Sequence, residues 1–451
     1  MKQQKSYTFN QLHTAGIFQC ILILSSSFLL LSSCTQKKNS VTLSSSDISD
    51  VITKMTDIMV RDITNPPLGA RFFSYACLAG YEIVSENDTK FRSMYQILKG
   101  YPKIDKPGSA GSANYQLAAL LAIMETAKKM QPSGKVMGDF EDKFIDSCKK
   151  SGLDEDLLNN SINYAKFISQ QILAYAGTDG YNKISNLPRY TPLKTSGSWY
   201  PTPPGFLAPV EPYFNTVRPF TLDSATQFRP MVPVMYDEKA GSPFYDLTLA
   251  VYKEGNELKG DHREIASFWD CNPFAMQDEG HLIFGFKKIS PGAHWLGITG
   301  IACQQAKKSF NESMFIYTIV SIGLMDANIS CWDEKYESNR IRPETAIRKL
   351  INPQWVPLLQ TPPFPEYTSG HSVVSSTSAV LLTHFFGENF SYRDSVEVAY
   401  DIPPRSFKSF HQAAAEAAIS RFYGGIHYMD AIIEGQEEGT KVGEWVLQKI
   451  K

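Results

Sequence analysis

The fold is decided by a stretch near the C-terminus, Ser369-Gly-His-Ser-Val-Val-Ser-Ser-Thr-Ser-Ala-Val-Leu-Leu-Thr-His-Phe-Phe386. The segment from His371 onward predicts a helix, and Ser369 stands where the N-cap of that helix is expected. The free amides of Gly370 and His371 would then point outward from the positive end of the helix dipole, where oxyanions bind readily. His371 would lie beside such an anion as an acid or base. The other interpretation of this tripeptide is a serine-capped helix with an exposed histidine.

A second basic cluster lies upstream of this helix. Lys335 ends a long apolar segment, and Arg342 follows about two helical turns later, directly before Pro343. Proline at this position suits the first turn of another helix, so the two cations could converge on one anion from adjoining segments. Taken alone, however, Lys-x6-Arg-Pro is more typical of a solvated basic surface at a helix end.

A third cluster, Ser420-Arg-Phe-Tyr-Gly-Gly-Ile-His427, follows the helix. Arg421 would end one helix and His427 would begin the last one, because Gly424-Gly425 breaks the chain between them. The turn allows both side chains to face the same point. A guanidinium offers paired hydrogen bonds to an oxyanion, and a neutral imidazole offers a lone pair that can attack or coordinate its central atom. A basic helix end followed by a glycine turn is the alternative interpretation.

The rest of the chain predicts an all-α fold of two packed helical bundles, the C-terminal one carrying the oxyanion site. Helical periodicity recurs in residues 47–186, and a proline- and aromatic-rich connection over residues 187–241 is expected to be ordered and to pack over the surface. Residues 242–451 form the second helical domain, and no run of strands is long enough to make a sheet. The expected helices of this domain lie near residues 242–256, 300–337, 343–350, 370–386, 406–423 and 428–449.

Composition excludes a general attraction to polyanions. The chain has 451 residues with 43% hydrophobic side chains, and its 44 basic side chains are balanced by 46 acidic ones. Any positive potential must therefore be local, and no nucleic-acid partner is expected.

The N-terminus has the pattern of an export signal. Lys2 and Lys5 precede an apolar run that is too short and too rich in serine to span a bilayer. The run ends in Leu31-Ser-Ser-Cys34, which resembles the bacterial lipoprotein cleavage box, in which the cysteine is acylated. We therefore expect a signal peptide over residues 1–34, a polar tether over 35–46 and an exported bacterial lipoprotein. It would be anchored to the periplasmic or cell-surface face of a membrane only through a lipid on Cys34. An ordinary secretory signal with a chance cysteine is the alternative.

The cysteines of the remaining chain indicate neither a disulfide framework nor a zinc site built from paired CxxC motifs, because their number is odd and their spacings are wide. Most are expected to be buried thiols. They are Cys77, Cys148, Cys271, Cys303 and Cys331.

Together and in this order, the three clusters resemble the active-site signature shared by the vanadate-dependent haloperoxidases and the type 2 phosphatidic acid phosphatases. The resemblance extends upstream to segments similar to those of long exported bacterial proteins grouped with the haloperoxidases, so that it covers roughly residues 190–451. These segments are Thr202-Pro-Pro-Gly205, Arg218-Pro-Phe220, Gln227-Phe-Arg-Pro230, Phe268-Trp-Asp-Cys-Asn-Pro273 and His294-Trp295.

The resemblance implies a role for each cluster residue. His371 is the acid/base residue, and His427 bonds to vanadium or attacks phosphorus. Vanadate is the implied cofactor, and phosphate can occupy the same site. The residues implied to bind the oxyanion's oxygens are Lys335, Arg342, Ser369, Gly370 and Arg421.

The chain departs from the family pattern after His427. The family commonly has an aspartate four residues later that holds the other ring nitrogen, and this chain has Ala431 there. Asp430 could substitute from the same helical face, with Glu434 as a second candidate.

Two reactions fit the signature. A haloperoxidase would oxidise a halide with hydrogen peroxide at a vanadate bound to His427, with Lys335 polarising the peroxide. A phosphatase would form a phosphohistidine from a phosphoester. The long chain and the proline-rich connection favour the haloperoxidase, because phosphatases with this signature are much shorter. Trp332 and His294-Trp295 could line the site, although packing is the more typical role of such residues.

A non-catalytic lipoprotein that captures phosphate or another anion is a hypothesis of a different class. An incomplete catalytic set would favour it, and here both His371 and His427 are present.

Overall fold

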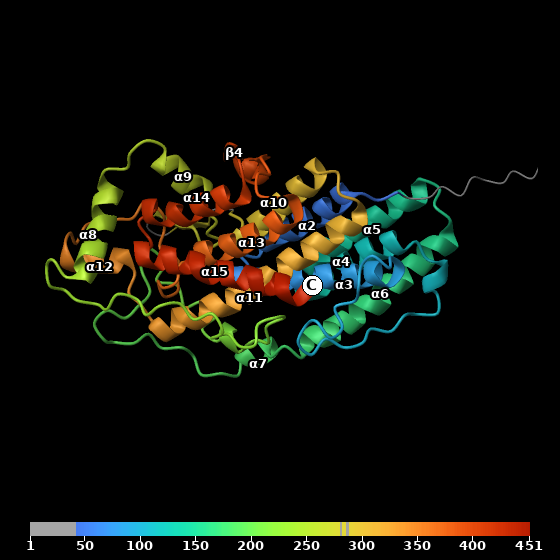
Figure 1. Ribbon diagram of the computed structural model, residues 1–451, viewed down its shortest axis with the longest axis horizontal. Helices are drawn as coiled ribbons and strands as arrows, with labels where there is room; N and C mark the ends of the chain where they lie inside the picture. The colour runs from blue at the N-terminus through green and yellow to red at the C-terminus, as the bar shows by residue number, and fades with distance from the viewer. Residues whose placement is uncertain (1–41, 280–281, 286–287) are drawn as a thin grey trace, which may run out of the picture.

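A computed structural model describes residues 42–451 apart from residues 280–281 and 286–287. Helices dominate the described chain (Figure 1), which confirms the predicted all-α class. The expected signal peptide and Cys34 lie outside the described residues. Two short antiparallel hairpins interrupt the helices, β1 (Met276–Glu279) with β2 (Leu282–Gly285) and β3 (Tyr392–Asp394) with β4 (Arg405–Phe407).

Most of the N-terminal helices lie toward one end of the elongated molecule, whereas the short helix Tyr181–Ile184 (α7) lies near its middle (Figure 1). Side-chain caps determine where several of them begin, because the first amides of a helix lack backbone partners. Asn65, for example, accepts from the Leu68 amide at 2.9 Å. The helices are α2 (Ser45–Arg61), α3 (Pro66–Asn87), α4 (Tyr115–Met130), α5 (Gly134–Lys150), α6 (Glu155–Gly177) and the short α7 (Tyr181–Ile184).

The C-terminal helices follow the predicted segments with three differences. Residues 405–407, at the start of the helix expected over 406–423, form strand β4, and the short helix His262–Phe268 was not predicted. The single helix expected over residues 300–337 is two helices, α10 and α11, because the chain turns at Lys307 with φ of 52° and Ser309 then caps a new helix. Ser309 and Glu312 form a capping box, which satisfies the first amides of α11. The helices are α8 (Pro243–Asn256), α9 (His262–Phe268), α10 (Pro291–Gln305), α11 (Phe310–Ser338), α12 (Pro343–Leu350), α13 (Gly370–Phe386), α14 (Phe410–Tyr423) and α15 (Met429–Ile450).

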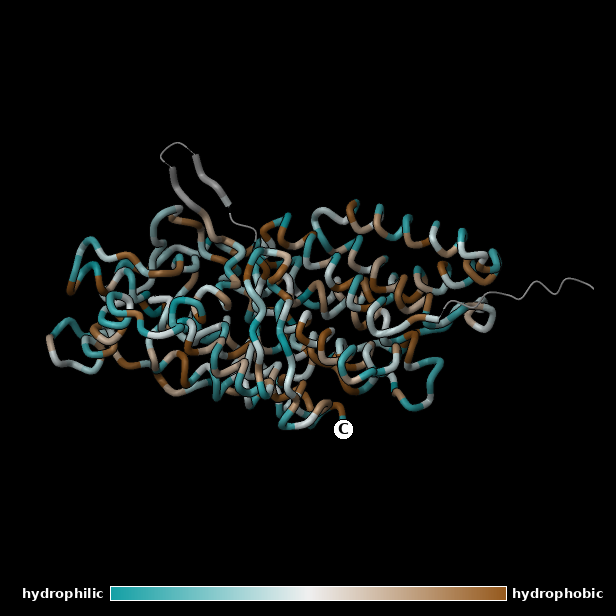
Figure 2. The backbone as a smooth tube through the Cα atoms, turned by 90° about the horizontal axis from the view of Figure 1, so that it is seen from above, coloured by the Kyte–Doolittle hydropathy of each residue, from teal (hydrophilic) through white to brown (hydrophobic). Residues whose placement is uncertain are grey.

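Helix α11 passes through the middle of the molecule and packs against both α3 and α13. It is long and apolar enough to cross a membrane, but 94% of its apolar window is buried inside the protein, as in the core helix of a soluble protein. Helices at the edge of the molecule instead show hydrophilic and hydrophobic turns in alternation (Figure 2). The core is therefore continuous from the N-terminal helices to the C-terminal ones.

The proline-rich connection packs against α11. The buried carboxylate of Asp326, in the middle of α11, accepts from the amides of Phe220 (2.7 Å) and Thr221 (2.8 Å). Farther along the connection, the Val210 amide donates to the Pro363 carbonyl at 3.1 Å. The connection thus contacts the loop that precedes α13. Its one helical turn is η2 (Phe214–Thr216), and the other short turns of this type are η1 (Ala110–Ser112) and η3 (Val396–Tyr400).

Candidate active site

The first turn of α13 forms one wall of the site. Ser369 is the N-cap of α13, as predicted, and its Oγ accepts from the Ser372 amide at 3.3 Å. Its own amide donates to the Ala431 carbonyl in α15 at 3.0 Å, which joins the starts of the two helices. A Cβ placed on Gly370 would lie 3.9 Å from Lys335 Cε, so the helix start faces the lysine.

Lys335 lies in the last turn of α11 and is fully buried. Its Nζ donates to the carbonyls of Pro365 (3.3 Å), Glu366 (3.2 Å) and Thr368 in the loop before α13. Burial lowers the pKa of Lys335 to about 8, and the charge of Arg342 acts in the same direction. A bound anion would stabilise the cationic form of this amine.

Arg342 is also fully buried and bonds to the same loop. Its Nε donates to the Phe364 carbonyl (2.9 Å), and its Nη1 donates to the Ile426 carbonyl (3.0 Å) and lies 3.1 Å from His427 Nε2. The structure therefore brings Lys335 and Arg342 together at one loop. Nη2 has no hydrogen-bond partner within the described chain. Burial lowers the pKa of Arg342 to about 10, so its guanidinium remains charged near neutral pH.

Arg421 approaches from the end of α14. Its Nε donates to Ser420 Oγ at 2.9 Å, and its Nη2 donates to the Trp269 carbonyl at 2.7 Å. Burial lowers the pKa of this guanidinium as well. Three buried cations from three separate elements thus surround the two histidines.

His427 follows the Gly424-Gly425 turn, where Gly425 adopts a φ of 77° that favours glycine. Its Nδ1 lies 2.8 Å from Glu366 Oε1. Burial and the charges of Arg342 and Lys335 hold the pKa of His427 well below its usual value, so the ring is neutral. Because the guanidinium of Arg342 can only donate, Nε2 accepts from Arg342 Nη1 and carries the lone pair, and Nδ1 carries the proton that it donates to Glu366.

Glu366 corrects the expectation that Asp430 or Glu434 orients His427. Asp430 Oδ2 instead pairs with Arg340 Nη1 at 2.8 Å, and Glu434 accepts from the Met231 amide at 3.1 Å. Neither carboxylate therefore holds Nδ1 of the imidazole, which bonds to Glu366. Glu366 lies in the turn just before Ser369. Its contact with His427 could not be predicted from sequence, because the two residues are 61 positions apart and no local motif links them.

His371 borders the same cavity as Gly370, Arg421 and His427. Its Nε2 is buried and has no hydrogen-bond partner among the residues described, while a hydrogen bond with the backbone of Trp269 raises its pKa slightly. Burial and the charge of Arg421 outweigh that bond and hold the pKa well below its usual value. A neutral His371 therefore presents Nε2 as a free base toward the cavity.

The cavity fits a tetrahedral oxyanion. Arg342 Nη2 is a buried donor without an acceptor, and leaving such a group unpaired costs about 1–3 kcal/mol or more. An anion would supply the missing acceptor, and His427 Nε2 faces the same region. Trp332 and Phe364 line the cavity, as suggested for Trp332 from sequence. Trp295 does not line it, because its Nε1 donates to Ser375 Oγ at 2.9 Å within the core.

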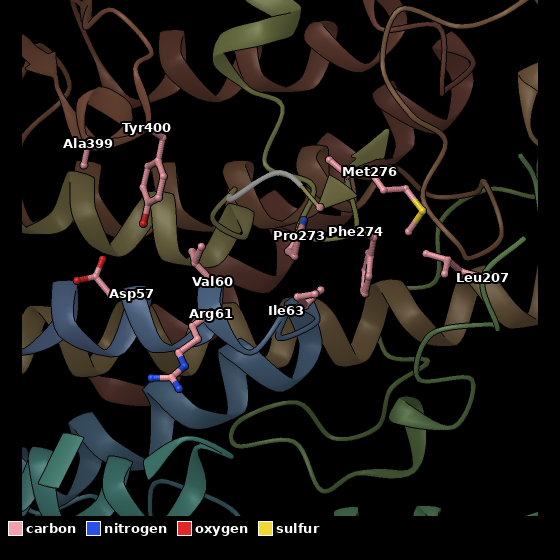
Figure 3. Close-up of a pocket in the computed structure, with 12 residues that line it drawn as sticks. Asp57, Val60, Arg61, Ile63, Leu207, Pro273, Phe274, Met276, Ala399 and Tyr400 are labelled. Carbon is pink, nitrogen blue, oxygen red and sulfur yellow. The ribbon is translucent and has the colours of Figure 1, made fainter. Parts of the chain in front are cut away.

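A second cavity, of about 840 Å³, lies next to this site and lacks its histidines. Figure 3 shows Asp57 and Tyr400 at one end of it and Leu207 and Met276 at the other, with Phe274 between them. Pro273 and Phe274 line both cavities. The large cavity is therefore an apolar neighbour of the oxyanion site rather than the site itself.

Comparison with known proteins agrees with this geometry. Residues 315–451 match the domain family described as the VCPO second helical-bundle domain. No curated protein matches the chain. A solved structure described as the first bacterial vanadium-dependent iodoperoxidase is 42% identical and has a TM-score of 0.87, with 92% of this chain and 98% of that chain covered. A holo-type bacterial vanadium-dependent chloroperoxidase shares the fold at 14% identity, with a TM-score of 0.63 and coverage of 86% and 93%.

The fold and the site define a helical oxyanion-binding protein with a buried histidine at its centre. At 42% identity over nearly the whole of both chains, the chain belongs to the vanadium-dependent haloperoxidase family.

Proposed function

We propose that this protein is a vanadate-dependent haloperoxidase that oxidises iodide with hydrogen peroxide. The observation that carries the proposal is the neutral, buried His427, whose Nδ1 donates to Glu366 and whose Nε2 lies 3.1 Å from Arg342 Nη1. Burial lowers its pKa, and the charges of Arg342, Lys335 and Arg421 all act in the same direction. The 42% identical structure described as an iodoperoxidase supports iodide as the first halide to test. In the net reaction the O–O bond of the peroxide breaks, iodide gives up two electrons to it, one proton is taken up from solvent, and hypoiodous acid and water leave.

The residues of the site divide into those that would hold vanadate and those that would move a proton. His427 Nε2 would be the ligand to the metal, and the cations Lys335, Arg342 and Arg421 would neutralise the oxygens. Ser369 Oγ can donate its hydroxyl hydrogen, because its bond with the Ser372 amide uses only an acceptor position. Bound vanadate would supply Lewis-acid activation of peroxide.

His371 is the group that would take the proton from hydrogen peroxide. Its low pKa leaves Nε2 unprotonated at neutral pH, and the atom has no competing partner among the described residues. Arg421 and His371 share the backbone of Trp269 as a support, which holds the base beside one of the cations. A positioned base of this kind contributes about 10²–10⁴-fold to a rate.

The test is an assay of the chain lacking residues 1–34, with and without vanadate, for peroxide-dependent iodide oxidation. We expect activity only when vanadate, peroxide and halide are all present, and none from His427→Ala. Parallel assays with bromide and chloride give the halide preference. His371→Ala should slow turnover far more than it weakens oxyanion binding.

The same assay distinguishes the proposed haloperoxidase from a phosphatase with the same active-site signature. Hydrolysis of a phosphoester by the vanadate-free protein, inhibited when vanadate is added, would contradict the proposed oxidation and assign His427 as a nucleophile. Anion binding without either activity would instead indicate a non-catalytic binding protein.

We also propose that the protein is an exported lipoprotein anchored through Cys34. The support is the sequence of residues 1–34 alone, with its basic start, apolar run and cysteine-containing box. Cys34→Ala should move the protein from the membrane fraction to the soluble fraction of its host. A variant that stays with the membrane would contradict the anchor.

A further inference from the structure

A second polar cluster lies buried beside the oxyanion cavity, and the proposed reaction does not use it. Cys271 lies in the loop after α9, His294 lies in α10, and Glu397 lies in η3. All three side chains are buried, and Cys271 also lines the oxyanion cavity. Three separate elements therefore converge on one point.

The donor atoms of this cluster form an equilateral triangle. Cys271 Sγ lies 3.4 Å from His294 Nδ1 and 3.4 Å from Glu397 Oε1, and His294 Nδ1 lies 3.4 Å from Glu397 Oε1. The centre of such a triangle is about 2.0 Å from each corner, close to zinc–nitrogen and zinc–oxygen bond lengths of about 2.0–2.2 Å. An ion displaced away from the sulfur and above the plane would reach the zinc–sulfur distance of about 2.3 Å while keeping about 2.0 Å to the nitrogen and the oxygen.

The ring nitrogen of His294 that points away from the cluster, Nε2, bonds to a carboxylate, as is common in metal-binding histidines. Its Nε2 lies 2.8 Å from Asp394 Oδ2, and Asp394 Oδ1 accepts from the Val396 amide at 3.1 Å. A carboxylate on the second ring nitrogen sets the tautomer and orientation of a metal-bound histidine. The ring also stacks on Trp269, with centroids 4.7 Å apart and planes 25° apart. Nδ1 is thereby aimed at the thiol and at Glu397.

We propose that Cys271, His294 and Glu397 bind a divalent transition metal, with zinc as the ion to test. Thiolate, imidazole and carboxylate together suit zinc, whereas magnesium and calcium prefer oxygen ligands. Three protein ligands leave a fourth tetrahedral position for water. The site differs from the vanadate site in its donors: none of the three is among the residues proposed to hold the oxyanion, although Cys271 lines the same cavity.

The metal would fix the loop that supports the catalytic residues. Cys271 is two residues after Trp269, whose carbonyl accepts from Arg421 and whose backbone bonds to His371. Closing Cys271, His294 and Glu397 around one ion would tie this loop to α10 and to η3. Arg421 and His371 would then be held by a metal-linked frame.

Metal uptake by the full-length chain, measured without vanadate, tests the site. After incubation with zinc and removal of excess metal, we expect one zinc per chain by elemental analysis. Replacement by cobalt should give the thiolate-to-cobalt charge-transfer absorption. Zinc loading should also raise the melting temperature, and a chelator should reverse the rise.

Matched variants locate the metal. Cys271→Ser should abolish the cobalt–thiolate band, whereas Cys303→Ser, which changes another buried thiol, should retain it. Asp394→Asn should weaken zinc binding by about 10–100-fold without removing a ligand. A folded wild-type chain that retains no zinc and gives no cobalt band would overturn the proposal, and would leave His294 as a charged group held between Asp394 and Glu397. An unchanged band in a folded Cys271→Ser variant would overturn it equally.

Discussion

Glu366 bonds to Nδ1 of His427 and so determines that the other ring nitrogen, Nε2, faces the cavity. Glu366→Gln keeps the size of the side chain but replaces a charged acceptor with a neutral amide, so we expect vanadate affinity or kcat/KM for iodide to fall by about 10–100-fold. Asp430→Asn is the comparison variant. Asp430 pairs with Arg340, which also lies 3.5 Å from Glu366 Oε2, so we expect a smaller loss than from Glu366→Gln. Equal losses in the two variants, or a larger loss from Asp430→Asn, would contradict the assignment of Glu366.

Lys335 gives the vanadate-free protein a pH dependence that can be measured with sulfate, whose charge is constant over the range. Burial lowers the folded pKa of Lys335 to about 8 from an ordinary value of 10.5. The folded protein loses this cation as the pH rises through about 8, so sulfate affinity by calorimetry should fall above that pH. Lys335→Gln should bind sulfate more weakly and lack this step. A wild-type affinity constant from pH 7 to 9.5 would contradict the titration of Lys335.

Loss of the same proton, which weakens sulfate binding as the pH rises, increases the stability of the folded protein. Between about pH 8 and 10.5 the unfolded chain holds the lysine proton and the folded chain does not, so this residue makes the anion-free protein more stable as pH rises. The comparison of wild type with Lys335→Gln by denaturant unfolding isolates this contribution. Between about pH 8 and 10.5, the free energy of unfolding of the wild type should rise relative to that of Lys335→Gln as the pH increases.

Most residues of the site could be predicted from sequence because each cluster is local. The cap at Ser369, the glycine turn before His427 and the cation at the end of α11 are each set by neighbours within one or two helical turns. Glu366 could not be predicted, because its contact with His427 depends on the packing of a loop against the start of α15. The Asp430 hypothesis failed for the same reason, since helical spacing describes residues within a helix and His427 precedes it.

His371 lies in the first turn of α13 and His427 lies two residues before α15, and glycines of α15 determine how closely these helices approach. A Cβ on Gly439 would lie 2.1 Å from the Val373 carbonyl oxygen, which is backbone and cannot rotate away. Gly439→Ala should therefore force the helices apart, lower the free energy of unfolding by about 1–3 kcal/mol and reduce iodide oxidation. Denaturant unfolding and kcat/KM measure the two effects.

Gly177 provides the control for this substitution. It ends α6, and a Cβ there would meet nothing within 4 Å. Gly177→Ala should change stability by less than about 1 kcal/mol, with stabilisation the expected direction in a helix, and should leave activity unchanged. A Gly439→Ala variant as stable and as active as Gly177→Ala would show that the close approach is not required.

At the level of elements, sequence predicted helix positions well and helix boundaries less well. The break between α10 and α11 was not predicted, because hydrophobic periodicity continues on both sides of it and residues 300–337 resemble one long apolar helix. The signal for the break was Ser309 followed by Glu312, a capping-box pattern. The hairpins could not be predicted from sequence, because strands of three or four residues are too short to show an alternation of hydrophobic and polar residues.

Across the whole molecule, the connection over residues 187–241 joins the N-terminal helices to the site. Its prolines predicted an ordered segment, but the groups that hold it come from elsewhere in the chain. One attachment is Asp326 in α11, and another is the Tyr367 hydroxyl, which donates to the Met231 carbonyl at 2.6 Å. Sequence could not supply these partners because each lies about a hundred residues or more from its acceptor or donor.

Asp326 makes this long-range link testable. Its carboxylate accepts from the amides of Phe220, Thr221 and Leu222 and from the Thr221 hydroxyl (2.6 Å), all in the buried interior. Asp326→Ala leaves these donors without an acceptor, and each buried unpaired group costs about 1–3 kcal/mol. We expect the free energy of unfolding to fall by about 3 kcal/mol or more, and limited proteolysis to cut first within residues 187–241. Asp237→Ala, in an exposed turn of the same connection, should change neither result. Cleavage of Asp326→Ala at the wild-type rate and positions would mean that the remaining contacts hold the connection without Asp326.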